Sequence, residues 1–225
     1  MTTSLVSARW IVTGIEDNGE PVVIPNAALA HDNGRVVAVG HADQIRTTYE
    51  GAAETSYGAH MMLPGFVNSH HHVGLTPLQL GSPDYALELW FAGRLSARDI
   101  DPYLDTLYSA FEMIESGITT VQHIHGWMKG PYANVHSAAS AVLRAYKDMG
   151  MRTSYSFAVR EQNHFVYESN EEFCNRLPPD VGTVLAAHLK AQEMPFNEFM
   201  TLFDDLREAN ASPLGKIQLA PANLH

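Results

Sequence analysis

The sequence predicts an α/β protein in which a small β-rich module precedes a region of alternating strands and helices. Residues 1–63 contain short apolar and β-branched runs separated by turn residues. From residue 64 onward, strand-like runs alternate with longer stretches whose apolar residues recur at helical spacing. Hydrophobic residues make up 45% of the 225 residues and charged residues 17%, a composition that supports a packed core. We therefore divide the chain into an N-terminal β-sandwich part, 1–63, and a second part, 64–225.

The first part is predicted to be built from short strands. The segments that favour strands are Leu5–Gly14, Pro21–Ile24, Ala27–Ala30 and Arg35–Val39. Asp32-Asn33-Gly34 is a hairpin turn signal, and it stands directly before the last of these strands. An alternative is that these strands begin one continuous α/β sheet. The lack of a helix-length pattern before Ala42 favours a separate β module.

The second part is predicted to consist of βα units. Its strand candidates are Gly65–Ser69, Ile118–Ile124, Arg152–Val159 and Lys216–Ala220. Its helix candidates are Pro102–Ser116, Asn134–Met149, Glu171–Arg176 and Pro195–Glu208, while the pattern leaves Val181–Lys190 ambiguous. Alternation of strands and helices is typical of a parallel sheet, so we expect parallel pairing in this part.

Charge and cysteine content exclude several classes of protein. The net charge is −11 with histidine neutral, whereas nucleic acids and anionic membranes require a basic surface. No stretch of ~18 apolar residues predicts a transmembrane helix, and the start of the chain lacks a secretory pattern. The single cysteine, Cys174, cannot form an internal disulfide and favours a reducing, cytoplasmic location. The 12 histidines, against 14 lysines and arginines, indicate metal or acid–base chemistry.

The most informative motif is His70-His71-His72, at the end of the predicted strand Gly65–Ser69. Because side chains alternate along a strand, His70 and His72 should point to one face and His71 to the other. Two imidazoles on one face can bind a single metal ion such as zinc. The alternative for this pair is a polar loop, or histidines bonded to backbone carbonyls. For His71 we expect packing or a supporting hydrogen bond.

A second His-x-His pair, His123 and His125, ends the predicted strand Ile118–Ile124. We expect both at the same edge of the sheet as His70 and His72, as contacts of a substrate or of the metal ligands. A second metal site and an ordinary polar rim are the alternatives. Trp90 is a candidate for stacking on a planar ring, although core packing is the default for an aromatic residue. His225 is a weaker candidate for a third ligand.

Three blocks of the chain resemble the amidohydrolase superfamily: Asp32–Gly40, Leu63–His72 and Asp84–Trp90. Within that superfamily the chain is most similar to the branch of triazine hydrolases and aminohydrolases, which includes purine-type and cytosine deaminases. Glu112 and the segment Gly117–Val121 match the entry into the second barrel strand of that branch.

The resemblance implies a TIM-type (β/α)₈ barrel together with a β-sandwich formed by both ends of the chain. It implies a single Zn²⁺ or Fe²⁺ held by the His-x-His pair, a histidine of strand five and an aspartate of strand eight. His70 and His72 are metal ligands by this resemblance. The metal would activate water for attack on a small heterocyclic substrate, from which an amine leaves. Gln79 stands where many members carry arginine, and its neutral amide cannot clamp an anionic substrate group as arginine does.

The length of the chain departs from that family. A TIM barrel takes ~250 residues, whereas the 162 residues from 64 to 225 have room for about five βα units at most. We therefore expect a partial barrel of about four units, the N-terminal portion of a longer enzyme. The strand-five histidine, the strand-eight aspartate and the general base have no candidates in this sequence, so we expect no activity from these residues alone.

The hypothesis is a metal-dependent hydrolase of non-peptide C–N bonds that deaminates a heterocycle. One alternative within the superfamily is hydrolysis of a cyclic amide or of a chlorinated heterocycle. Another, of a different class, is a truncated, non-catalytic module for binding or dimerisation. The expected partners are a small heterocyclic substrate and a second copy of the chain, with no nucleic acid or membrane.

Overall fold

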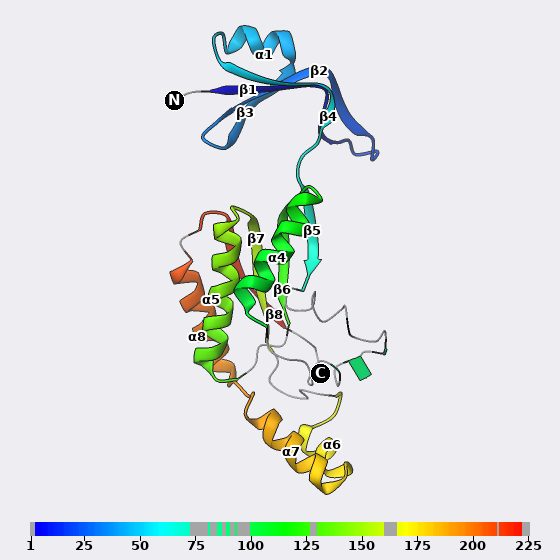
Figure 1. Cartoon of the computed structure of the whole chain (residues 1–225), viewed down its shortest axis with the longest axis vertical. Coiled ribbons are helices and arrows are strands. Elements are labelled where there is room, and N and C mark those ends of the chain that lie inside the picture. The colour runs from blue at the N-terminus through cyan, green and yellow to red at the C-terminus, as the bar shows by residue number, and fades with distance from the viewer. Residues whose placement is uncertain are drawn as a thin grey trace. The chain divides into compact units, whose positions relative to one another are not determined.

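The computed structural model describes residues 3–72, 81, 85–86, 89–90, 93, 100–126, 130–159, 166–210 and 212–221. The chain divides into two compact units, Met1–Gly65 and Phe66–His225, each with its own sheet (Figure 1). Among the described residues, no helix is long and apolar enough to cross a membrane.

The first unit is a four-stranded sheet with the strand order β3-β2-β1-β4. Its elements are β1 (Ser4–Ile15), β2 (Pro21–Asp32), β3 (Arg35–His41), α1 (Ala42–Thr48) and β4 (Ala53–Met62). Strands β1, β2 and β3 are antiparallel neighbours, whereas β4 pairs parallel to β1. The expected hairpin joins β2 to β3. Asn33 and Gly34 have positive φ angles of 49° and 74°, the backbone that a tight two-residue hairpin turn requires.

The sequence pattern divided β2 into two runs, but the structure has one strand of 12 residues. Asn26 joins the runs with a positive φ of 46°, and the pairing of β2 with β1 keeps one register on both sides of it. Pro25, which lacks an N–H, is tolerated because β3 pairs with β2 only from Ala27 onward.

Helix α1 packs on one face of this sheet through a core of Leu5, Ala28, Ala30, Ala42 and Ile45. A second small cluster contains Ala8, Ile11 and Ala27. Ala27 and Ala28 are adjacent in a strand and belong to different clusters, so the two clusters lie on opposite faces. The described residues of this unit therefore form one sheet, a single layer of the predicted sandwich.

The second unit is a sheet of four parallel strands in the order β5-β6-β7-β8. The strands are β5 (Phe66–His71), β6 (Ile118–His125), β7 (Arg152–Val159) and β8 (Gly215–Pro221). The helices are α4 (Pro102–Glu115), α5 (Tyr132–Asp148), α6 (Asn170–Arg176), α7 (Pro179–Lys190) and α8 (Phe196–Ala209). Consecutive strands are neighbours, as in a partial barrel of four βα units. The ambiguous segment Val181–Lys190 is helical and belongs to α7.

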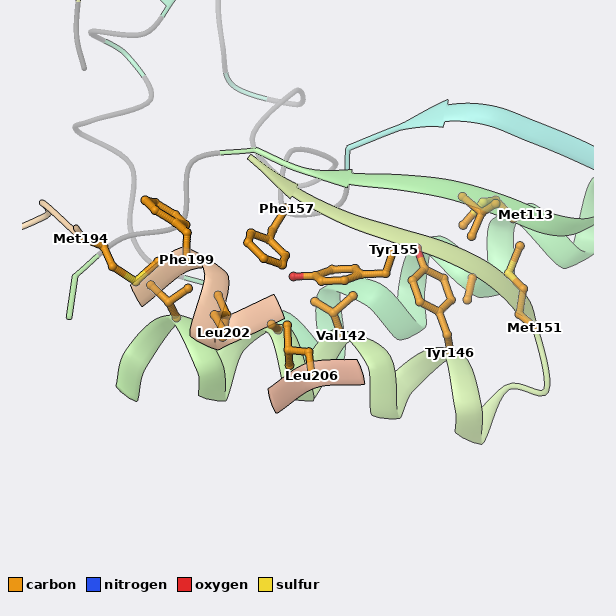
Figure 2. Packing of buried hydrophobic residues seen from close by; sticks show 14 residues of the cluster. Met113, Val142, Tyr146, Met151, Tyr155, Phe157, Met194, Phe199, Leu202 and Leu206 are labelled. Carbon is orange, nitrogen blue, oxygen red and sulfur yellow. The ribbon is translucent and has the colours of Figure 1, made fainter. Parts of the chain in front are cut away.

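The core of this unit lies between one face of the sheet and helices α4, α5 and α8. Tyr155 and Phe157 of β7 point from the sheet toward Val142 and Tyr146 of α5 and toward α8 (Figure 2). We call this the helix-side face. The residues of β7 that alternate with Tyr155 and Phe157 point to the opposite face of the sheet. The residues of β6 and β8 that pair with those alternating residues point to that opposite face too.

Candidate metal centre

A β-bulge at the end of β5 decides which histidines face which side of the sheet. Asn68 pairs with Val121 of β6, but His71 pairs with His123, so three residues of β5 span two residues of β6. The Asn68 side-chain amide contacts the Met113 sulfur of α4 at 3.8 Å, which places Asn68 on the helix-side face. Regular alternation from Asn68 would put His70 on that face too. Because of the extra residue, His71 lies on the helix-side face instead, and His70 and His72 point away from it.

The side chains of His70 and His72 converge on one point. Their Nε2 atoms are 3.0 Å apart, and their rings meet edge to face with centroids 4.8 Å apart. The Nδ1 atom of His72 lies 2.7 Å from the carbonyl oxygen of Ile124, at the end of β6. A carbonyl oxygen only accepts hydrogen bonds, so Nδ1 carries the proton and Nε2 of His72 presents a lone pair toward Nε2 of His70.

This arrangement fits a metal ion. Two ligand nitrogens at ~2.0–2.1 Å from a tetrahedral zinc ion lie roughly 3.3 Å apart, close to the distance between these two Nε2 atoms. A metal-binding histidine commonly donates its other N–H to a carbonyl, as His72 does to Ile124. Within the part of the chain that the structure describes, no group of three His, Cys, Asp or Glu residues could hold a metal ion. His70 and His72 are therefore two candidate ligands of an incomplete set.

His71 lies between β5 and the helix layer. Its ring faces that of His123, with centroids 6.3 Å apart and an angle of 79° between the planes. Burial is the main cause that lowers the pKa of His71. The neighbouring His72 also lowers this pKa, whereas the Glu112 carboxylate opposes the shift. His71 is therefore neutral at pH 7 and belongs to the packing behind the candidate metal ligands.

His123 is completely buried on the helix-side face, in register with Tyr155 of β7. Its Nδ1 atom lies 3.1 Å from the hydroxyl of Tyr146 on α5. Burial, with smaller effects of the neighbouring histidines, lowers the pKa of His123 well below its usual value. His123 lies at the same edge of the sheet as His70–His72, paired with His71, and its role there stays a prediction. Its side chain faces the helices and has no exposed surface, which the alternation alone did not predict. The reason is that the strand pattern shows which residues share a face but not which face is buried.

The structure also describes two other residues of the predicted site, His125 and Trp90. His125 is half-buried, and its Nδ1 atom lies 2.8 Å from the hydroxyl of the buried Tyr155. Trp90 is half-buried in a helical turn, where its backbone N–H donates to the carbonyl of Ala86 at 2.9 Å. Gln79 and His225 lie outside the described residues. Among the predicted site residues that the structure describes, His70 and His72 converge through their Nε2 atoms, and the rings of His123 and His125 lie 5.5 Å apart.

Two groups at the site could not be recognised from the motif alone. The carbonyl of Ile124, which fixes the ring of His72, is a backbone atom and leaves no trace in residue type. The hydroxyl of Tyr146 lies on the predicted apolar face of its helix, where a buried tyrosine needs a hydrogen-bond partner. The need of a buried tyrosine for a hydrogen-bond partner was the feature of the sequence that could have indicated a polar group on the helix-side face of the sheet.

Comparison with known proteins places this arrangement in a family. Residues 61–210 match the amidohydrolase family. A 5-methylthioadenosine/S-adenosylhomocysteine deaminase of Nitratidesulfovibrio vulgaris (strain DP4) is 29% identical over 156 residues. That alignment covers 66% of this chain and 32% of the relative. The chain therefore spans about a third of the length of the curated relatives that it matches.

Solved structures share the fold. Atrazine chlorohydrolase TrzN from Arthrobacter aurescens TC1, crystallised with zinc, superposes with a TM-score of 0.71 at 17% identity. The superposition covers 98% of this chain and 47% of that one. Aminofutalosine deaminase of Helicobacter pylori, in complex with methylthio-coformycin, gives a TM-score of 0.64 at 14% identity, covering 97% of this chain and 43% of that one.

The family match extends over two thirds of the sequence and includes the strand and bulge that direct His70 and His72 to one point. The parallel four-stranded sheet and its helix layer agree with the partial barrel that these structural similarities indicate. By its sequence and its fold, the chain belongs to the amidohydrolase family.

Proposed function

We propose that the protein is a metal-dependent hydrolase of C–N bonds other than peptide bonds, and that it deaminates a heterocyclic amine. The observation that carries the proposal is the convergence of His70 and His72, with their Nε2 atoms 3.0 Å apart at the carboxyl end of a parallel strand. In barrel enzymes the reactive groups lie at that end of the strands.

His70 and His72 would hold the metal ion, Zn²⁺ or Fe²⁺. Such an ion, when bound, lowers the pKa of water toward neutrality and polarises the group under attack. The role of His72 depends on the Ile124 carbonyl, which holds the ring in the tautomer that leaves Nε2 without a proton. The Ile124 carbonyl thus holds the His72 ring so that its Nε2 lone pair points to Nε2 of His70, from which it accepts a hydrogen bond before any metal binds.

The substrate class rests on the relatives. The deaminases of 5-methylthioadenosine and S-adenosylhomocysteine share sequence with this chain, which favours an aminopurine nucleoside as the substrate. The likeness to atrazine chlorohydrolase TrzN, at 17% identity, concerns the fold alone and does not by itself favour dechlorination.

Zinc binding by the purified natural protein and by its His70→Ala and His72→Ala variants tests the metal site. We expect the wild type to bind zinc and each variant to lose more than the ~10–100-fold typical of changes around the ligands. His60→Ala, an exposed histidine of β4, is the control and should bind as wild type does. Equal zinc binding by wild type, His70→Ala and His72→Ala would show that this pair is not the metal site.

Ammonia release from aminated purine nucleosides, pyrimidines and triazines tests the reaction. Release from a purine nucleoside, lost in His72→Ala, would support deamination. A zinc-loaded protein that releases no ammonia from any of these amines, yet hydrolyses a cyclic amide or a chlorinated triazine, would exclude it. A zinc-loaded protein with no turnover of any kind would favour a binding module.

A cytoplasmic location and self-association are further parts of the proposal. Cys174, the only cysteine, is free and buried, in keeping with a reducing compartment. Leu104, Tyr108 and Phe111 expose more than half of their surface along α4, which favours contact with another copy. Cell fractionation and sedimentation velocity decide these two points. A periplasmic or secreted protein, or a monomer at micromolar concentration, would contradict them.

A further inference from the structure

A group of buried polar side chains lies behind the candidate metal ligands, on the helix-side face of the sheet. His71 of β5 and His123 of β6 are in register, and their ring centroids are 6.3 Å apart. His123 has no exposed surface, and its Nδ1 atom is held by the Tyr146 hydroxyl of α5 at 3.1 Å. The proposed metal chemistry uses neither histidine.

Both histidines retain a nitrogen without a partner. Within the described part of the chain, the Nε2 atoms of His71 and His123 are buried and neither makes a hydrogen bond. A buried polar atom without a partner costs free energy comparable to a lost hydrogen bond, so native proteins rarely leave two side by side. Ordered water commonly supplies the missing partner where two or more polar atoms converge.

The spacing of the rings suits one water molecule. Two hydrogen bonds of ~2.9 Å to one water place the bonded nitrogens roughly 4.7 Å apart. Adding up to ~1 Å from each nitrogen to its ring centre gives a centroid separation of at most ~6.7 Å, and the observed 6.3 Å lies within that limit. A water molecule both donates and accepts hydrogen bonds, so it can bridge the two nitrogens whichever tautomer each ring adopts.

We propose that one buried water bridges His71 Nε2 and His123 Nε2, and that this bridge positions the β5 bulge that directs His70 and His72 toward the metal. The bulge is fixed at its start by Asn68, which contacts Met113 through its side-chain amide. The Asn68 side-chain oxygen also accepts from the backbone N–H of His70 at 3.2 Å. The bridge fixes the other end, at His71, through His123 and Tyr146 to α5.

This inference rests on the proposed function, because its consequence is the affinity of the His70–His72 pair for metal. His71 and His123 are positioning residues, since they act through the backbone of the bulge. Removing the bridge frees the bulge to shift, and a shift by one residue reverses which histidines face the metal. Changes that act through residues around a metal typically weaken binding by ~10–100-fold.

The test compares zinc affinity and unfolding stability of the natural protein with those of three variants. His123→Phe removes the bridging nitrogen but keeps a ring of similar size. His123→Gln retains a side-chain amide near the position of Nε2. Tyr155→Phe is the matched control, because it removes a buried hydroxyl bonded to His125 at 2.8 Å on the neighbouring strand.

We expect His123→Phe to weaken zinc binding by ~10–100-fold while remaining folded. His123→Gln should bind zinc nearly as wild type does. Tyr155→Phe should lose stability without losing zinc affinity. If His123→Phe fails to fold, Tyr146→Phe, which removes only the hydroxyl that anchors His123, takes its place and should weaken zinc binding to a smaller extent. A crystal structure should show a water within hydrogen-bond distance of both Nε2 atoms.

The outcomes separate the two proposals. A wild type that binds no zinc would refute the metal site and with it this positioning role. A wild type that binds zinc, together with a folded His123→Phe that binds it equally well, would refute the positioning role alone. Loss of zinc affinity in Tyr155→Phe equal to that in His123→Phe would show a general loss of packing and would also refute it. A crystal structure without the water would refute the bridge.

Discussion

Substitution of Gly182 by alanine tests how closely α6 and α7 pack. Gly182 is buried in α7, and a Cβ atom added there would lie 2.3 Å from the carbonyl oxygen of Cys174 in α6. The same oxygen accepts the backbone N–H of Leu177 at 3.2 Å, at the end of α6. Because a carbon–oxygen contact needs roughly 3.3 Å, the two backbones must separate by about 1 Å.

Two opposing effects set the size of the change. Alanine is favoured over glycine inside a helix by ~0.8–1.0 kcal/mol. Overpacking costs ~1–3 kcal/mol, and the upper part of that range applies because the atom met is backbone, which cannot rotate away. We expect a net loss of about 1–2 kcal/mol in the stability of the α6–α7 pair. This corresponds to a factor of roughly 5–30 in its opening equilibrium.

Amide hydrogen exchange along α7 measures this opening directly. We expect Gly182→Ala to exchange its α7 amides roughly 5–30 times faster than wild type. Val184→Ala, at a position 71% exposed on the same helix, is the control and should change exchange little. Slower exchange in Gly182→Ala would show that helix propensity outweighs the contact and would refute the close approach of Gly182 to Cys174.

Two further predictions concern the second unit. His72 should carry its proton on Nδ1, because that atom donates to the Ile124 carbonyl at 2.7 Å; ¹⁵N chemical shifts of the ring report the tautomer, and a proton on Nε2 in the metal-free protein would contradict the geometry. Asp101→Ala should destabilise α4 by about 1 kcal/mol in urea unfolding, since the Asp101 carboxylate accepts the N–H groups of Tyr103 and Leu104 at 2.8 and 3.1 Å; an unchanged midpoint would show that the cap contributes nothing.

Local sequence determined most of the elements, because periodicity and turn chemistry act over a few residues. The run Arg152–Val159 is β7 with the same bounds, and the turn at Asn33 and Gly34 joins β2 to β3. Helix α7 was harder to recognise, because a glycine in its interior lowers helix propensity. That glycine is present because α6 leaves no room for a side chain, which is a tertiary requirement.

The faces of the strands were decided only by tertiary structure. Alternation in β6 shows that Val121, His123 and His125 share one face, but not whether that face meets the helices or the opposite side. Val121 is completely buried against the helices, so His123 is buried with it. The apolar character of Val121 was the one local indication.

For the metal centre, the sequence by itself determined that His70 and His72 share a face, because side chains alternate along any strand. It could not determine which face, since the bulge between Asn68 and His71 arises from the pairing of β5 with β6. Nor could it determine the tautomer of His72. That tautomer is set by the backbone carbonyl of Ile124, which is 52 residues away in the sequence. Contacts of this kind depend on where the chain returns in space, and only the folded sheet brings them together.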